Sequence, residues 1–187
     1  MSADISLEKA LLLFASKNDD EFAQGMNVLF RRYVNRTEIW DAFVKYVVDN
    51  PTSEIPAVLI YYLAHIPWHP DIVWNGDEPI TNETRQYARQ LLSRFEKAEV
   101  VKLLSFIDEE RGIERGSMGQ SVAAIVLSLP QANPILASIA DDLSAPVFTR
   151  ECAAFILAKR VRTEEKPSSE NWRTQAQRIL QLGRKLN

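Results

Sequence analysis

Cysteine and surplus positive charge are both scarce in this sequence. A single cysteine, Cys152, among 187 residues means that no disulfide can form within the chain. The 22 lysines and arginines are outnumbered by 25 aspartates and glutamates, and the net charge is −3. Because nucleic-acid binding needs a basic surface to contact phosphates, this balance disfavours a general nucleic-acid binder. It mildly favours a basic partner protein.

Long apolar runs are also missing. No stretch of about 18 apolar residues runs unbroken, so the sequence predicts no membrane-spanning helix. The first residues, MSADISLEKALLLFASK, contain no basic region and carry Asp4 and Glu8 ahead of a short apolar run, which is unlike a signal peptide. We therefore expect a cytoplasmic protein.

Motifs of known catalytic chemistry are absent as well. No serine elbow, metal-ligand signature or nucleotide fingerprint occurs. The glycine-rich stretch RGIERGSMGQS (111–121) lacks the Lys-Ser/Thr ending and the preceding strand of a phosphate loop. We interpret it as an inter-helix turn with Ser117 near a helix cap. Cys152 has no histidine near it in the sequence, which is typical of an inert core thiol. We predict a protein that is not an enzyme and uses no cofactor or metal.

The apolar residues that are present follow a helical period. In LEKALLLFASK, Leu7, Ala10, Leu11 and Phe14 recur at i, i+3, i+4 and i+7, and comparable spacing continues through the later segments. No segment alternates apolar and polar residues for long enough to predict a sheet. The predicted fold class is therefore all-α.

A small residue recurs on the second helix of each expected helix pair, at steps of about 30 to 36 residues, as in helical repeat arrays. These residues are Gly25, Ala57, Ala88, Ala124 and Ala154. A helix pair cannot bury its own apolar face, and small residues let the neighbouring pair approach closely. We expect one domain over 1–187, with repeats at about 7–34, 38–66, 70–95 (degenerate), 97–129 and 133–162. A capping helix is expected at 170–186, with an apolar face of Trp172, Ala176, Ile179 and Leu186.

The segment NPILASIADDLSAPVFTRECAAFILAK resembles a HEAT-type repeat. The residues that carry the match are Val147, Arg150, Ala153, Ala154 and Leu157. The earlier segment DEPITNETRQYARQLL keeps Arg85 and Ala88 of the same pattern. The resemblance implies a right-handed α-solenoid of HEAT/ARM-like helix pairs, whose second helices usually line a concave and often protein-binding surface. It implies no chemistry, because function belongs to sites and not to the fold.

The stretch HIPWHPDIVWNGDEPI (65–80) interrupts the helical pattern. It holds both histidines of the chain and two of its four tryptophans. Its prolines and Asn75-Gly76 forbid a regular helix, so we expect an irregular loop where the third repeat should have its first helix. Long irregular loops in a repetitive scaffold are where function tends to reside.

Three interpretations of this loop can be compared. A zinc site would use His65, His69, Asp71 and Asp77, but the prolines remove the helical spacing that pins metal ligands, which disfavours it. In the second interpretation, the aromatic residues fold down and cap the end of the second repeat. In the third, the tryptophans anchor a partner, since tryptophan is enriched in interface hot spots. The last two are compatible if one tryptophan is buried and the other exposed; the residues concerned are Trp68, Ile72 and Trp74.

Acidic residues gather at the expected turns inside the repeats. They are Asp19, Asp20, Glu21, Asp49, Asp77, Glu78, Asp108, Glu109, Glu110, Asp141 and Asp142. Equivalent turns of a solenoid stack along one edge, so these acids are expected to form an acidic edge, with Arg31, Arg32, Arg94, Lys159, Arg160 and Arg162 on the opposite edge. Interaction with the helix dipoles, at about 0.3–1 kcal/mol per residue, is one complete explanation of the pattern. An acidic face that steers a basic protein is the functional alternative.

These features together favour a non-enzymatic protein-binding module. One instance is an intracellular immunity protein that inhibits a basic toxin or nuclease by masking its surface. The residues expected to contact the partner are Trp68, His69, Trp74, Asp77, Glu78, Asp108, Glu109, Glu110, Asp141 and Asp142. A scaffold or adaptor is one alternative. Another is a nucleic-acid-binding protein of the HEAT-like DNA-glycosylase type, which would need a basic groove made by Arg32, Arg36, Arg85, Arg89 and Arg94.

Overall fold

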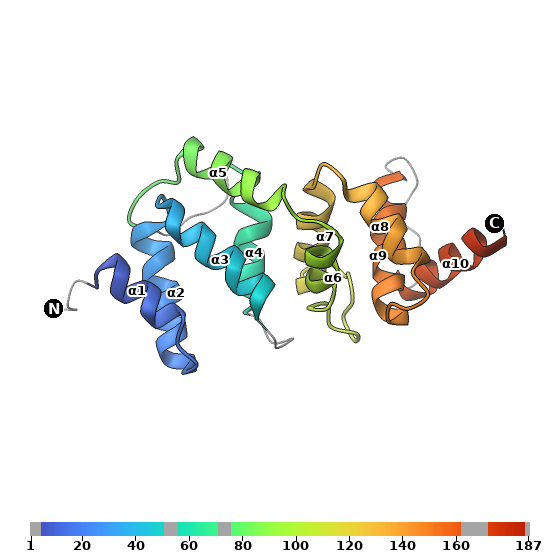
Figure 1. Ribbon diagram of the computed structural model, residues 1–187, viewed down its shortest axis with the longest axis horizontal. Helices are drawn as coiled ribbons and strands as arrows, with labels where there is room; N and C mark the ends of the chain where they lie inside the picture. Colours follow the sequence, from blue (N-terminus) through green and yellow to red (C-terminus); the bar gives the residue numbers. More distant parts are fainter. Residues whose placement is uncertain (1–4, 51–55, 71–75, 162–171, 186–187) are drawn as a thin grey trace. The chain divides into compact units, whose positions relative to one another are not determined.

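The computed structural model describes residues 5–50, 56–70, 76–161 and 172–185, and within them it contains helices and no strand (Figure 1). The all-α prediction is confirmed. The helices are α1 (Leu7–Phe14), α2 (Asp19–Tyr33), α3 (Thr37–Asp49), α4 (Ala57–His65), α5 (Asn82–Leu92), α6 (Lys97–Leu104), α7 (Met118–Ser128), α8 (Ala132–Asp141), α9 (Val147–Val161) and α10 (Trp172–Lys185). Each helix in the described residues is too short or too polar to cross a membrane.

The helices belong to two compact units. The first comprises Met1–Tyr46 and Ile66–Leu91, and the second comprises Val47–His65 and Leu92–Asn187. Each unit has its own set of buried apolar side chains. An irregular loop was expected in place of the first helix of the third repeat. In the described residues before α5, 66–70 and 76–81 contain only turns, bends and irregular backbone.

The first unit is built around α1, α2 and most of α3. Phe14 of α1 and Phe22 of α2 stack with their ring centroids 5.0 Å apart, and Phe30 and Phe43 do so at 4.4 Å. Gly25 lets the two helices meet, since a Cβ atom at this position would lie 2.3 Å from the backbone nitrogen of Phe14. The glycine therefore serves the close approach of α1 to its own partner helix.

Capping residues fix where the first helices begin. The Ser6 side chain accepts from the backbone N–H of Lys9, and the Asn18 side chain accepts from that of Glu21. Asp19, Asp20 and Glu21 fill the first turn of α2, where negative charge complements the helix dipole. Their position is the one expected from interaction with the helix dipole.

The second unit contains α4, which packs against α7, and the helices α6 to α10. Ala88 of the first unit and Ala154 of the second are buried as expected, whereas Ala57 is exposed. The expectation that Ala57 mediates a close helix approach is therefore wrong. Cys152 is fully buried, and burial raises the pKa of its thiol to about 12. The thiol therefore stays protonated and unreactive at neutral pH.

The glycine-rich stretch forms the turn that precedes α7. Ser117 is the N-cap residue of α7 and its hydroxyl accepts from the backbone N–H of Gln120, so the predicted position of Ser117 is confirmed. Gly112 has a φ of 51°, in the left-handed region that favours glycine. A Cβ atom on Gly112 would lie 2.0 Å from the indole of Trp172, which shows how closely α10 covers this turn.

Helix α10 packs on α9 through both apolar and polar contacts. Trp172 and Ala176 are buried, in agreement with the expected apolar face, while the side chains of Ile179 and Leu186 lie outside the described residues. Glu151 of α9 is only 2% exposed, and its carboxylate accepts from Arg173 and from Gln177, each at 2.9 Å. A buried carboxylate without such partners would be costly, so these bonds fix α10 on α9.

Candidate functional site

Two arginines of α5 hold the irregular segment 66–70. Nη1 of Arg85 donates to the carbonyl of Ile66 and, at 3.0 Å, to that of His69, and Nη2 donates to the carbonyl of Pro70 at 3.4 Å. Nη1 of Arg89 donates to the carbonyl of Pro67 at 3.2 Å. Arg85 is 7% exposed; its bond to Ile66 is buried, and the other three bonds are partly buried. We call this arrangement the arginine clamp.

The clamp replaces hydrogen bonds that a helix would have supplied. Pro67 and Pro70 have no N–H and cannot continue a helix, so the carbonyls of this segment need donors from elsewhere. A guanidinium offers five N–H donors in a fixed plane, which suits several carbonyls at once. The side chains of α5 thereby hold a segment that cannot form regular secondary structure.

Hydrogen bonds from Asn35 hold the start of α5, and they thereby fix the position of Arg85 in its first turns. The side-chain oxygen of Asn35 accepts from the backbone N–H of Thr81 and from the hydroxyl of Thr84, both at 3.0 Å. Its amide nitrogen donates to the carbonyl of Pro79 at 2.9 Å. Asn35 lies between α2 and α3, so this one side chain ties α5 to the body of the first unit.

The clamped segment presents two of the predicted contact residues. Trp68 is half-buried and His69 is exposed. Trp74, with Asp71 and Ile72, falls outside the described residues, so the choice between a capping and a binding role for the second tryptophan stays a prediction. In the described part of the chain, no three His, Cys, Asp or Glu side chains are placed to hold a metal ion.

Asp77 is exposed but paired with cations. Its carboxylate lies 3.3 Å from Nη2 of Arg31 and 3.6 Å from Nε of Arg32, and its backbone N–H donates to the carbonyl of Arg31 at 2.7 Å. The expectation that Arg31 and Arg32 lie on the edge opposite Asp77 is therefore wrong. The neighbouring Glu78 is exposed.

The acidic turn 108–110 of the second unit has mixed roles. One carboxylate oxygen of Asp108 accepts from the backbone N–H groups of Glu110 and Arg111, so this side chain stabilises the turn. Glu109 lies 3.7 Å from Nη1 of Arg173, and Glu110 is exposed.

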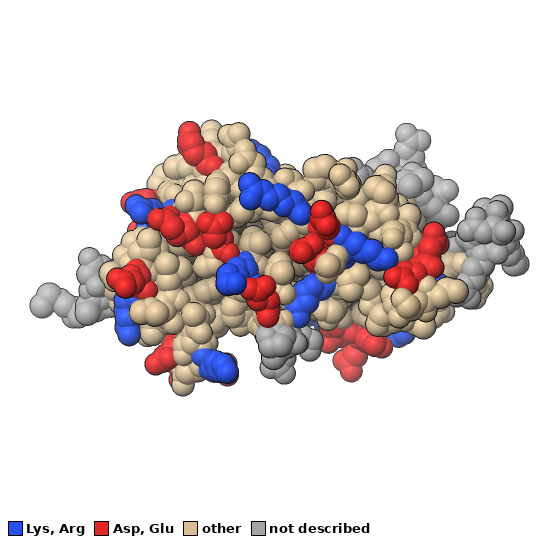
Figure 2. Space-filling model, in the orientation of Figure 1, with Lys and Arg blue, Asp and Glu red and all other residues tan. Residues whose placement is uncertain are grey.

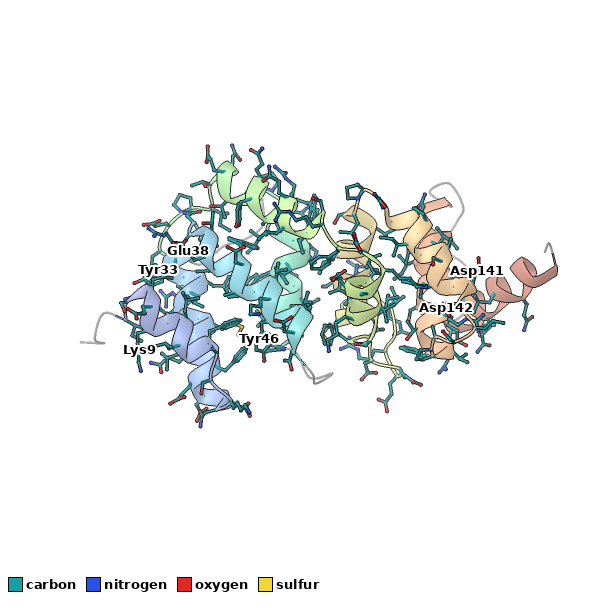
Figure 3. The ribbon with its side chains drawn as sticks, viewed as in Figure 1. Lys9, Tyr33, Glu38, Tyr46, Asp141 and Asp142 are labelled. Carbon is teal, nitrogen blue, oxygen red and sulfur yellow. The ribbon has the colours of Figure 1, made fainter. Side chains whose placement is uncertain are left out.

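The other acidic pair, Asp141 and Asp142, lies at the end of α8 (Figure 3). Asp141 is exposed. Asp142 accepts from the hydroxyl of Ser144 at 2.6 Å and from Nζ of Lys97 at 2.9 Å. These two bonds, the serine bond first, hold the pKa of Asp142 well below its ordinary value.

Acidic and basic side chains are interspersed on the face of the molecule in Figure 2. Three of the predicted contact acids, Asp77, Glu109 and Asp142, each form an ion pair. Glu78, Glu110 and Asp141 are also exposed.

Four of the five arginines proposed for a nucleic-acid groove contact other groups of the protein. Arg32 contacts Asp77, and Arg36 lies 3.2 Å from Glu38. Arg85 and Arg89 donate to backbone carbonyls in the clamp. Arg94, in the turn after α5, is exposed. The contacts of the first four weigh against a shared phosphate-binding role.

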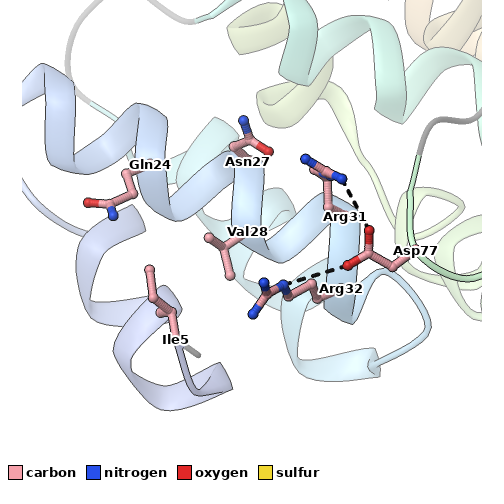
Figure 4. Close-up of a pocket in the computed structure, with 7 residues that line it drawn as sticks. All are labelled: Ile5, Gln24, Asn27, Val28, Arg31, Arg32 and Asp77. Atoms are coloured by element: carbon pink, nitrogen blue, oxygen red, sulfur yellow. Dashed lines mark hydrogen bonds and ion pairs between the residues drawn. The ribbon is translucent and has the colours of Figure 1, made fainter. Parts of the chain in front are cut away.

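One surface pocket was missed by sequence reasoning. It encloses about 280 Å³ in the first unit and is lined by Ile5, Gln24, Asn27, Val28, Arg31, Arg32 and Asp77 (Figure 4). Asp77 lies 46 residues beyond Arg31, and no local pattern signals that the chain returns there. The sequence did not predict the arginine clamp either, because Arg85 bonds to residues 15 to 19 positions away. Arg85 was identified only as part of the repeat pattern.

Comparisons with protein-family models, with curated proteins and with solved structures found no match to this chain. A functional assignment therefore depends on the residues and contacts described above.

Proposed function

We propose that this chain is a non-enzymatic protein-binding module whose first unit contacts its partner through the segment held by the arginine clamp. The observation that carries the proposal is the set of bonds from Arg85 and Arg89 to the carbonyls of residues 66–70. An irregular segment that is ordered in advance loses little conformational freedom on binding. In this role, Trp68 is the apolar anchor and His69 the adjacent polar contact.

We further propose that the helices are HEAT/ARM-like repeats of a right-handed α-solenoid. Two buried sets of side chains support this: Thr84, Arg85 and Ala88 of α5, and Thr149, Arg150 and Ala153 of α9. The two sets have the same spacing in the sequence. Arg150 donates through Nε to the carbonyl of Ala140 at 3.0 Å, just as Arg85 donates to a carbonyl that precedes its own helix. A shared contact of this kind is what repeated units would retain.

The partner in this proposal is a basic protein, and the chain acts as an inhibitor of the immunity-protein type. The net charge of −3 and the exposed acids support it: Glu78 in the first unit, and Glu110 and Asp141 in the second. Exposed charges at the rim of an interface mainly raise the association rate and make it depend on salt. In this proposal Trp68 makes the central apolar contact with the partner.

The experiment is affinity capture from native lysate with the full chain and with matched variants. We expect a basic protein to bind the wild type and to be lost with Trp68→Ala. With Glu78→Lys we expect less capture at low salt and a smaller difference from wild type at high salt, where exposed charges are screened. Leu12→Ala is the control, because Leu12 of α1 is 64% exposed in the same unit and outside the clamp. Circular dichroism verifies that each variant is folded.

Two results would overturn the proposal. One is a captured protein that binds Trp68→Ala as well as wild type. The other is a shift of duplex DNA by the wild type at physiological salt, which would instead support the nucleic-acid alternative.

A further inference from the structure

The turn between α8 and α9 displays apolar side chains to solvent. Leu143 is 75% exposed, and Val147, the first residue of α9, is 62% exposed. Pro146, which precedes Val147, is also exposed. A single exposed apolar residue is common on protein surfaces, whereas three within five positions form a candidate contact surface. We call Leu143, Pro146 and Val147 the apolar tip of the second unit.

Hydrogen bonds fix the backbone of this turn. The Asp142 carboxylate accepts from the backbone N–H of Ser144 at 3.1 Å and from the hydroxyl of Ser144 at 2.6 Å. The backbone N–H of Ala145 donates to the carbonyl of Asp142 at 3.0 Å. The backbone N–H of Arg150 donates to the carbonyl of Pro146 at 3.1 Å. The tip is therefore ordered in advance and loses little conformational freedom when another protein covers it.

One anion and one cation near the tip have no partner. Asp141, two residues before Leu143, is exposed (Figure 3). Arg94 is exposed and lies three residues before Lys97, whose Nζ is 2.9 Å from Asp142 at the turn. Within the residues that the structure describes, neither Arg94 nor Asp141 forms a hydrogen bond or an ion pair.

Two further acids near Lys97 are engaged at a helix start. Glu96 and Glu99 form a capping box, in which the Glu99 side chain accepts from the backbone N–H of Glu96 at 2.9 Å. Their carboxylates complement the N-terminus of α6, where the helix dipole favours negative charge. The unpartnered charges near the tip are thus one of each sign.

We propose that the apolar tip is a contact between two copies of this chain, related by a two-fold axis. Such a contact brings the same surface of both copies together, so that surface must complement itself. Apolar side chains do so, and Arg94 of one copy can pair with Asp141 of the other. A wholly basic or wholly acidic partner would leave one of these two charges unpaired.

This contact uses other residues than the arginine clamp. In the dimer Asp141 is covered by the second copy, and Glu78 and Glu110 are the exposed acids that remain for the basic partner proposed above. Standard interfaces bury about 800 Å² per partner, and the three side chains of the tip cover much less. We therefore expect a weak dimer, with a dissociation constant of roughly 10–1,000 μM.

The first test is sedimentation equilibrium of the full chain at concentrations that span this range. The variants are Leu143→Ser, Asp141→Arg, Arg94→Asp and the two charge reversals combined. Leu12→Ser is the matched control, because Leu12 is 64% exposed and belongs to the first unit. Circular dichroism verifies that each variant is folded.

We expect the wild type to dimerise and Leu143→Ser to do so about tenfold more weakly, because an apolar side chain is lost from the contact. Each single charge reversal should weaken the dimer about threefold, because it places like charges opposite each other. The combined reversal and Leu12→Ser should match the wild type. A combined reversal that binds no better than the single variants would contradict the pairing of Arg94 with Asp141.

Two other results would overturn the proposal as a whole. One is a Leu143→Ser variant that dimerises as the wild type does. The other is a wild type that stays monomeric at every concentration, which would leave the tip to a different protein.

A cross-linking experiment then locates the contact. Cys152 is the single cysteine of the chain and is fully buried, so Leu143→Cys adds the one accessible thiol. We expect a bismaleimide to link two copies of this variant in high yield and to link copies of the control Leu12→Cys only slightly. Equal yields from the two variants would contradict a contact at the tip.

Discussion

Arg85 and Arg150 are each the fourth residue of their helix, α5 and α9, but they donate hydrogen bonds to different kinds of backbone. Arg150 of α9 makes a bond of 3.0 Å to the carbonyl of Ala140, in the last turn of the regular helix α8. Arg85 of α5 reaches three carbonyls of a segment that contains two prolines and no helix. Most carbonyls of α8 accept hydrogen bonds within the helix, and Arg150 bonds to one carbonyl of its last turn. The carbonyls of residues 66–70 are not in a helix, so Arg85 supplies donors to three of them.

Arg85→Ala should have the largest effect. We expect the free energy of unfolding of the first unit to fall by about 4 kcal/mol, because three carbonyls lose a charged donor in a mostly buried place. Urea unfolding, followed by circular dichroism, measures it. A decrease in the free energy of unfolding of less than about 1 kcal/mol would contradict this, because it would mean that water can hydrogen-bond the three carbonyls in place of Arg85.

Arg150→Ala should lower the free energy of unfolding less than Arg85→Ala does. We expect a loss of about 2 kcal/mol, because the side chain is 6% exposed but bonds to a carbonyl at the end of a helix that is otherwise complete. The same unfolding experiment applies, with Arg94→Ala as the exposed control that should change little. If Arg150→Ala costs more than Arg85→Ala, the distinction between the two arginines fails.

The smallest effect concerns Asp142, which follows α8. Its pKa is lowered from an ordinary value of 3.8 by the bonds from Ser144 and Lys97, so the ionised form is the one that the folded state favours. Its contribution to stability is therefore complete above pH 3.8 and is lost as the pH falls toward the lower, folded-state pKa.

Asp142→Asn provides the measurement. The difference in unfolding free energy between wild type and this variant should be fully present near about pH 6 and should shrink as the pH falls from about 4 to about 2. Asp141→Asn is the matched control, since Asp141 is exposed and neighbouring. A difference that stays constant over that range would contradict the assignment of the effect to the Asp142 carboxylate.

The helices and some of their ends follow from local sequence. Apolar spacing predicted the all-α fold, Ser117 was predicted near a cap, and the buried Trp172 and Ala176 were predicted on one face. These features depend on residues a few positions apart. Sequence reasoning could read them because the helical period fixes which neighbours share a face.

The contacts that define the candidate sites depend on distant residues. Asp77 meets Arg31 across 46 positions, and Arg85 meets Ile66 across 19. Their charges suggested opposite edges for Arg31 and Asp77, and a basic groove for Arg85. The first suggestion is wrong, because polar groups bond to the partner that the fold brings near, whatever the local charge pattern. The bonds of Arg85 to backbone carbonyls weigh against the second.

The most direct test of the arginine clamp is the backbone order parameter of Trp68 and His69, measured by NMR relaxation on the full chain. The account predicts values of about 0.85, equal to those of α5, because four carbonyls of residues 66–70 are held by Arg85 and Arg89. Values below about 0.6 at both residues would contradict it, because the segment would then move freely instead of being held for a partner.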